Sequence, residues 1–183
     1  LADDGQALRV IDRERAAEID PALTPVKEQI AGAIYCPTDE TGDSHKFTRA
    51  IADLCKQEKA EFLLGTEILD IETNGDRIDG VKTSNGDVHA DAYVMSLGNH
   101  SPIFARRIGI DLPIYPVKGY STTMSVGNHP HPPTIGAVDE ENLVAYCPMG
   151  ERLRLTATAE FSGYSTAHKP SDFRHMLKVA KAL

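Results

Sequence analysis

The sequence predicts a mixed α/β fold, in which helices and short strands alternate along most of the chain and strands dominate the last third. The first observation is an amphipathic helix pattern over residues 44–59, which an apolar strand pattern follows. The second is a series of short strands joined by Asn-Gly turns over residues 67–90. The third is a Thr-rich alternation that begins near Ile114.

The N-terminal segment is expected to hold a short helix and a strand. Asp12 can accept a hydrogen bond from the first turn of a helix that runs to Ile19, and Pro21 ends this helix. Residues 32–35 are expected to form a strand. Residues 38–43 then predict a turn-rich loop.

The helix over residues 44–59 can be capped by Asp43 or by Ser44. Its apolar residues recur at helical spacing and share one face: Phe47, Ile51, Leu54 and Cys55. We expect this face to pack on a sheet, and residues 62–64 to follow as a strand.

The middle of the chain predicts an antiparallel meander. Residues 64–73 and 77–83 form strands around a turn at residues 74–76, and Asn85-Gly86 forms a second turn. Residues 93–97 show little polar alternation, which is typical of a strand buried on both faces.

A helix is expected directly after this apolar strand. Gly98 ends the strand, Ser101 serves as the N-cap, Pro102 takes the first helical position and Gly109 lies just beyond the helix. A buried strand that leads through Gly into a helix places backbone N–H groups where an anionic cofactor could sit.

The last third predicts a sheet. Its four expected strands are residues 115–126, 134–138, 143–147 and 153–161, and Ser171 is expected to cap a final helix. The change of character near Leu112 is the expected domain boundary.

Composition excludes several classes of protein. The chain has 183 residues, which suits one domain or two small ones. Its formal charge of −8 argues against a nucleic-acid-binding surface. No apolar run is long enough to cross a bilayer, and no signal peptide is visible. The three cysteines form no CxxC pair, which indicates a reducing compartment.

Several segments follow one another in an order typical of a known family. They are residues 64–98 with their two turns, residues 37–43 before the helix, residues 115–121 (Tyr-Pro-Val-Lys-Gly-Tyr-Ser), residues 152–155 (Arg-Leu-Arg-Leu) and Ala159-Glu160. Together they resemble the FAD-dependent D-amino-acid oxidase superfamily. Within it, the chain is most similar to the bacterial D-amino-acid dehydrogenase branch (small subunit).

The resemblance implies a domain organisation. Residues 34–111 would form part of an FAD-binding Rossmann-like domain, and residues 112–183 an antiparallel-sheet substrate domain, to which residues 1–33 would also belong. No GxGxxG motif is present, and the chain begins without Met. We therefore expect a central fragment that lacks the N-terminal dinucleotide-binding motif and is inactive in isolation.

The resemblance also implies cofactor-binding residues. Ile68 occupies the position whose backbone pairs with the adenine edge of FAD, and Ser96, Leu97 and Gly98 form the turn beside the cofactor. Gly98 permits a close approach of the backbone. The alternative interpretations involve no cofactor: Ile68 would be an ordinary core residue of a strand, and Gly98 would serve only the turn from strand to helix.

Three candidate substrate-cavity residues are Lys118, Gly119 and Tyr120, which the resemblance places on a strand facing the flavin. Lys118 could bring a positive charge to the flavin or to a substrate carboxylate, or extend to solvent from a strand edge. Tyr120 could line the cavity or pack within the sheet. The alternating Arg152 and Arg154 are expected to form a solvated face, because the substrate-gripping Arg of related oxidases comes later in the chain.

Residues 156–158 (Thr-Ala-Thr) stand where related dehydrogenases carry smaller residues, often Gly-Gly. This departure adds bulk near the expected cavity and puts the exact substrate in doubt. Glu160 is expected to have a structural role. His129 and His131 lie on a Pro-rich loop without carboxylate or Cys support, so no metal site is expected.

The implied reaction is the oxidative deamination of D-amino acids by hydride transfer to FAD, which gives 2-oxo acids and ammonia. The electron acceptor implied by the resemblance is a membrane quinone. Because no apolar run can cross a bilayer, we expect a cytoplasmic protein with at most peripheral contact with the inner membrane. The rival interpretations are another amine or 2-hydroxy-acid oxidoreductase of the superfamily, and a binding module that has lost the flavin.

Overall fold

A computed structural model describes residue 5 and residues 7–182 of the chain. The chain divides into two compact units. Unit 1 holds the segment up to Ala50, Lys118–Phe161 and the segment from Ser165, whereas unit 2 holds Ile51–Val117 and Ser162–Tyr164. The described strands all pair antiparallel, and helices accompany them in both units, which confirms the predicted mixed fold. The assignment of flavin and substrate domains stays a prediction.

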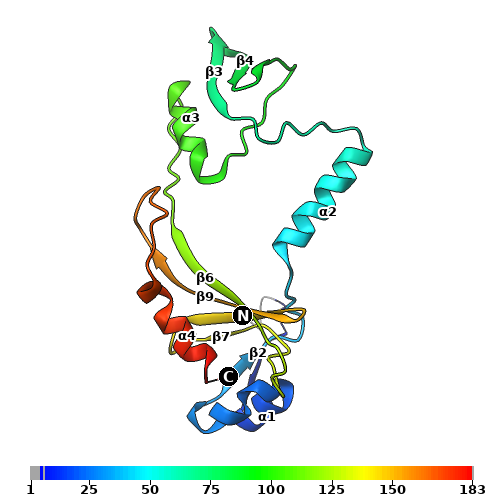
Figure 1. The fold of residues 1–183 in the computed structure, drawn as a ribbon, viewed down its shortest axis with the longest axis vertical. Coiled ribbons are helices and arrows are strands. Elements are labelled where there is room, and N and C mark those ends of the chain that lie inside the picture. The colour runs from blue at the N-terminus through cyan, green and yellow to red at the C-terminus, as the bar shows by residue number, and fades with distance from the viewer. Residues whose placement is uncertain (1–4, 6, 183) are drawn as a thin grey trace. The chain divides into compact units, whose positions relative to one another are not determined.

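Unit 1 is built on a four-stranded antiparallel sheet with the strand order β6-β9-β8-β7 (Figure 1). The strands are β6 (Lys118–Ser125), β7 (Ala137–Asp139), β8 (Val144–Met149) and β9 (Arg152–Glu160). The four predicted C-terminal strands are therefore all present, in the expected order.

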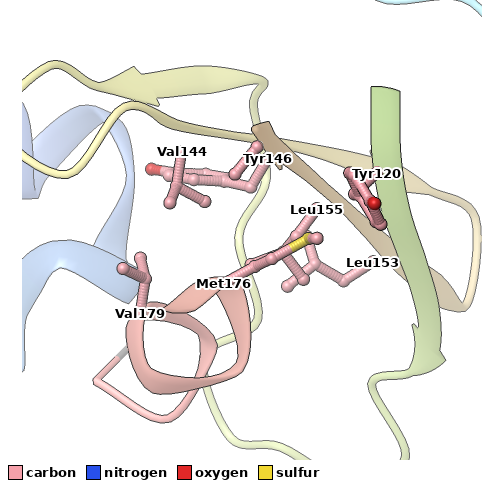
Figure 2. Close-up of a cluster of buried hydrophobic side chains, with 8 residues drawn as sticks. Tyr120, Val144, Tyr146, Leu153, Leu155, Met176 and Val179 are labelled. Atoms are coloured by element: carbon pink, nitrogen blue, oxygen red, sulfur yellow. The ribbon is translucent and has the colours of Figure 1, made fainter. Parts of the chain in front are cut away.

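One face of this sheet carries the core of unit 1 (Figure 2). Leu153 and Leu155 of β9 point into it, whereas Arg152 and Arg154, which alternate with them, are exposed, so the expected solvated face is confirmed. Helix α4 (Arg174–Ala180) covers the core and contributes Met176 and Val179. Each fully buried large apolar side chain stabilises the fold by roughly 1.5–3 kcal/mol.

Within unit 1, a buried carboxylate links the N-terminal segment to the residues around the four-stranded sheet. The segment contains β1 (Arg9–Ile11), α1 (Arg13–Ile19), a 3-10 helix (Pro21–Gln29) and β2 (Ala33–Tyr35), and the predicted cap is confirmed because Asp12 accepts a hydrogen bond from the Arg15 N–H at 2.8 Å. Asp20 is fully buried between the two helices. It accepts hydrogen bonds from the Thr134 N–H at 3.1 Å and the Tyr146 hydroxyl at 3.3 Å.

A β-bulge interrupts the pairing of β6 with β9. Gly119 lies opposite Ala159 and Tyr120 lies opposite Ala157, so Thr158 between them has no partner across the ladder. Thr158 has a φ of 63°, in the left-handed region that β-branched residues avoid. This conformation is how the chain accommodates an extra residue in one strand of an antiparallel pair.

The Thr158→Gly substitution is expected to raise the free energy of unfolding by about 1 kcal/mol. Glycine removes a backbone strain of about 1–3 kcal/mol, and its larger unfolded-state entropy offsets part of this gain. Urea unfolding of the full-length protein measures the change. Thr156→Gly is the control: this residue shares the strand and donates a hydrogen bond to the Tyr120 carbonyl at 3.0 Å, so its replacement should destabilise. If both variants lowered the free energy of unfolding equally, the result would contradict the expected backbone strain at Thr158.

Unit 2 contains the predicted meander as a three-stranded antiparallel sheet in the order β3-β4-β5. Its strands are β3 (Ile68–Asn74), β4 (Arg77–Thr83) and β5 (Gly86–Val88). A short 3-10 helix (Gly98–His100) leads directly into α3 (Ser101–Arg107). Turns form at residues 75–76 and 84–85, so the two predicted turns are present, the second one residue earlier than expected.

Three local predictions are wrong for the described residues. Residues 62–64 and 93–97 are not strands, and Val94 is 89% exposed. The helix α2 (Ser44–Gln57) forms and Asp43 caps it by accepting from the Lys46 N–H at 3.1 Å, but its apolar face is exposed rather than packed on a sheet. An apolar pattern indicates a surface suited to burial, whereas a strand also requires a hydrogen-bonded neighbour.

Candidate functional site

The turn at residues 96–98 leaves open space beside its backbone. Gly98 has a φ of +55°, and apart from its chain neighbours and the backbone of its own helix, no described heavy atom lies within 4 Å of the place a Cβ would occupy. Ser101 is the first residue of α3 rather than its N-cap, and its hydroxyl accepts a hydrogen bond from the Leu97 N–H at 3.2 Å. The serine therefore fixes the turn, so the predicted capping role is wrong.

Tyr164 supports the same turn from a distant part of the sequence. Its hydroxyl donates to the Asn99 carbonyl at 2.8 Å, and its ring centroid lies 5.4 Å from that of His100. Sequence reasoning missed Tyr164, because a contact across 65 residues leaves no local signal in one sequence.

Arg107 ties α3 to the strand that carries Ile68. Its guanidinium donates to the Leu69 carbonyl and lies 3.3 Å from the Asp70 carboxylate. The Ile71 backbone N–H, and then Arg107, lower the pKa of Asp70. Ile68 lies on β3, and the turn at residues 96–98 leads into α3, the helix that carries Arg107. Arg107 therefore links the two elements within unit 2.

Ile68 pairs with Thr83 of β4 and lies beside an irregularity in the β3–β4 register. Among the described residues, β3 has a strand neighbour on one side only. An edge strand can offer backbone N–H and C=O groups to a ligand. This edge, together with the open space at Gly98, fits the backbone contacts that a dinucleotide cofactor such as FAD requires.

The three substrate-cavity candidates lie together in unit 1. They line a shallow pocket of about 230 Å³ beside β6, which is an edge strand of the described sheet. The lining residues are Lys118, Gly119, Tyr120, Ser121, Thr166, His168 and Phe173. Sequence reasoning did not name the last four as site residues: Ser121 continues β6, and the other three follow the sheet in the sequence.

Lys118 is held in place on the pocket wall. Its ammonium group lies 3.0 Å from the Glu160 carboxylate and donates to the Ala167 carbonyl at 2.9 Å. The side chain is only 16% exposed, so it does not simply extend into solvent from the strand edge. The hydrogen bond with Glu160 raises the pKa of Lys118, which keeps the ammonium charged at neutral pH.

Tyr120 links the pocket to the core. Its side chain is buried, its ring meets that of Phe173 edge-on at 5.6 Å between centroids, and its hydroxyl donates to Glu160. The Glu160 carboxylate raises the pKa of the Tyr120 hydroxyl, so the phenol stays protonated. Tyr120 is a packed sheet aromatic and also lines this pocket, whereas its place in a substrate cavity stays a prediction.

The structure thus gathers the predicted site residues into two groups. Ile68, Ser96, Leu97 and Gly98 belong to unit 2, and the other three belong to unit 1. Within the described ranges, no group of three or more His, Cys, Asp or Glu side chains could hold a metal ion. No described helix is both long and apolar enough to cross a membrane.

Comparison with known proteins places this geometry in context. The sequence model of the DAO family, described as FAD dependent oxidoreductase, matches residues 1–183. D-amino acid dehydrogenase 2 of Mesorhizobium japonicum is 45% identical over 184 residues, which cover 100% of this chain and 44% of that protein. D-amino acid dehydrogenase of Granulibacter bethesdensis is 42% identical over 88% of this chain and 39% of its own length. The chain spans less than half of either relative.

Solved structures share the fold. Glycine oxidase from Bacillus cereus matches with a TM-score of 0.85 and 23% identity, over 99% of this chain and 48% of that one. L-proline dehydrogenase from P. horikoshii matches with a TM-score of 0.81 and 20% identity, over 98% of this chain and 48% of that one. At these identities the likeness concerns the fold alone.

Proposed function

Because the chain belongs to the DAO family of FAD-dependent oxidoreductases, we propose that it is part of an enzyme that oxidises D-amino acids to 2-oxo acids and ammonia. The observation that carries this proposal is the 45% identity with a D-amino acid dehydrogenase over the whole chain. That relative is more than twice as long, so the activity belongs to the longer protein that contains this chain.

The residues of unit 2 are proposed to border the cofactor. FAD, when bound, supplies the acceptor for the hydride that leaves the substrate Cα. The edge of β3 at Ile68 would meet the adenine end through its backbone. Ser96, Leu97 and Gly98 would lie against the cofactor where the open space at Gly98 admits it.

The Gly98→Val substitution is expected to weaken FAD binding by about tenfold or more, because its branched side chain would fill the open space beside the turn. Titration of the full-length apoprotein with FAD, followed by flavin fluorescence, measures the dissociation constant. Gly109→Val is the matched control, since Gly109 lies in the same unit, also has positive φ and also faces open space. Equal weakening by both variants would point to backbone strain instead of a cofactor contact.

The pocket of unit 1 is proposed to receive the substrate. The Lys118 ammonium would help to bind the substrate carboxylate, alongside the substrate-gripping Arg that the resemblance places later in the chain, since a charge-assisted hydrogen bond both holds and orients an anion. Tyr120 and Phe173 would provide apolar walls for the side chain. The substrate ammonium group would first lose a proton to solvent. Loss of the hydride from Cα would then give an iminium ion, which would add water and release ammonia to leave the 2-oxo acid. The electrons would then pass to an acceptor, for which we propose a membrane quinone.

Product analysis of the full-length enzyme tests the proposed reaction. With D-alanine and a two-electron dye as acceptor, one pyruvate and one ammonia should form for each dye molecule reduced. The same incubation with L-alanine is the control. Dye reduction without ammonia, or equal turnover of the two enantiomers, would contradict the proposal.

A further inference from the structure

The β-bulge at Thr158 determines which face of the sheet Glu160 occupies. Along β9, Leu153, Leu155 and Ala157 face the core, so strict alternation would turn Glu160 to the opposite face. The unpaired Thr158 shifts this alternation by one residue, and Glu160 then lies directly opposite Lys118. The bulge therefore brings a carboxylate to the face that carries Lys118 and Tyr120.

Glu160 compensates the charge of the cation at the pocket. Its Oε2 atom lies 3.0 Å from the Lys118 Nζ and also accepts from the Tyr120 hydroxyl. Glu160 does not line the pocket itself, whereas Lys118 does. A ligand in the pocket would therefore lie beside a lysine whose ammonium group is already paired with a carboxylate.

This arrangement discriminates between ligands by their net charge. An uncompensated lysine attracts any carboxylate, and the attraction is strong in a partly desolvated site. Glu160 repels a singly charged anion and so reduces that attraction. A zwitterion carries an ammonium group as well, whose attraction to Glu160 offsets this loss. The paired charges therefore favour ligands that carry both signs.

We propose that Glu160 is the residue that selects the substrate by net charge, favouring zwitterionic amino acids over 2-hydroxy acid anions. This inference rests on the proposed function of the Lys118 pocket. It gives Glu160 a role in specificity beyond the structural one expected from the sequence, and it accounts for the bulge that places Glu160 beside Lys118.

The test compares two substrates with the same carbon skeleton, D-alanine and D-lactate, in the full-length enzyme. Glu160→Gln removes the charge and keeps an acceptor for Tyr120. The ratio of kcat/KM for D-alanine to that for D-lactate should fall by about tenfold, a change in relative barrier of about 1.4 kcal/mol. Glu140→Gln, an exposed carboxylate of the same unit, is the control and should leave the ratio unchanged.

A binding measurement gives a second readout that does not depend on turnover. Propanoate shares the skeleton and carries only the negative charge, so calorimetry should show it binding at least fivefold more tightly to the Glu160→Gln enzyme. Lys118→Met provides a test in the opposite direction: it removes the cation beside Glu160, and propanoate should bind more weakly than to the wild type. Glu160→Ala removes the same carboxylate charge and keeps the inference testable if Glu160→Gln fails to fold: propanoate should again bind more tightly than to the wild type.

The outcomes separate the inference from the function on which it rests. Suppose that the wild-type enzyme oxidises D-alanine, but Glu160→Gln changes both the substrate ratio and the propanoate affinity less than twofold. This result would overturn the role of Glu160 and leave the proposed function standing. A wild-type enzyme with bound FAD that oxidises no amino acid would overturn the proposed function as well.

Discussion

The Asp20→Ala substitution is expected to lower the free energy of unfolding by about 3 kcal/mol. Asp20 is fully buried and accepts hydrogen bonds from the Thr134 backbone and the Tyr146 hydroxyl. Burial, and then the Asp20 carboxylate, raise the pKa of Tyr146, so this hydroxyl stays protonated and requires an acceptor. Alanine would leave both donors without this partner inside the fold.

Urea unfolding of the full-length protein measures this loss. Asp20→Asn keeps an acceptor oxygen of nearly the same shape and should cost less than Asp20→Ala. Asp12→Ala removes an exposed helix cap nearby, so its cost should be about 1 kcal/mol. A loss below 1 kcal/mol for Asp20→Ala would show that the buried carboxylate does not hold the N-terminal segment to the sheet.

The Lys118→Met substitution is expected to lower kcat/KM for D-alanine by about 100-fold in the full-length enzyme. A hydrogen bond to a charged group contributes about 1.5–3 kcal/mol, and the upper part of that range corresponds to this factor. Methionine keeps most of the apolar length of the lysine, so the pocket wall changes little. The loss would therefore report the missing ammonium group.

Two variants make this result specific. Lys118→Arg keeps the positive charge and should recover part of the activity, although its planar group does not reproduce the contacts of an ammonium. Lys27→Met removes a partly exposed lysine elsewhere in unit 1 and should have no effect. A less than threefold loss for Lys118→Met would exclude Lys118 as the carboxylate anchor.

Short-range patterns in the sequence predicted much of the fold. The cap at Asp12, the Asn-Gly turns and the alternation of Arg152 with Leu153 all depend on neighbours within a few residues, and the structure confirms each of them. The resemblance to the D-amino-acid oxidase superfamily is also confirmed by the match of the DAO family over residues 1–183.

The features that the sequence did not predict depend on distant partners or on broken periodicity. Residues 93–97 are apolar, yet no described strand pairs with them. Tyr164 reaches the Asn99 carbonyl across 65 residues. Thr158 shifts the alternation of β9, so a strict period of two would have placed Glu160 on the wrong face. The strand that carries Glu160 was therefore predictable from the sequence, whereas the ion pair between Glu160 and Lys118 was not.

Flavin reduction without oxygen tests the central claim most directly. The full-length protein would be purified with FAD, made anaerobic, and mixed in separate samples with D-alanine, L-alanine and D-lactate while the visible flavin band is recorded. We predict that D-alanine bleaches the band rapidly, that L-alanine does not, and that D-lactate does so much more slowly. A flavin that D-alanine leaves oxidised, or that both enantiomers reduce equally well, would contradict this account.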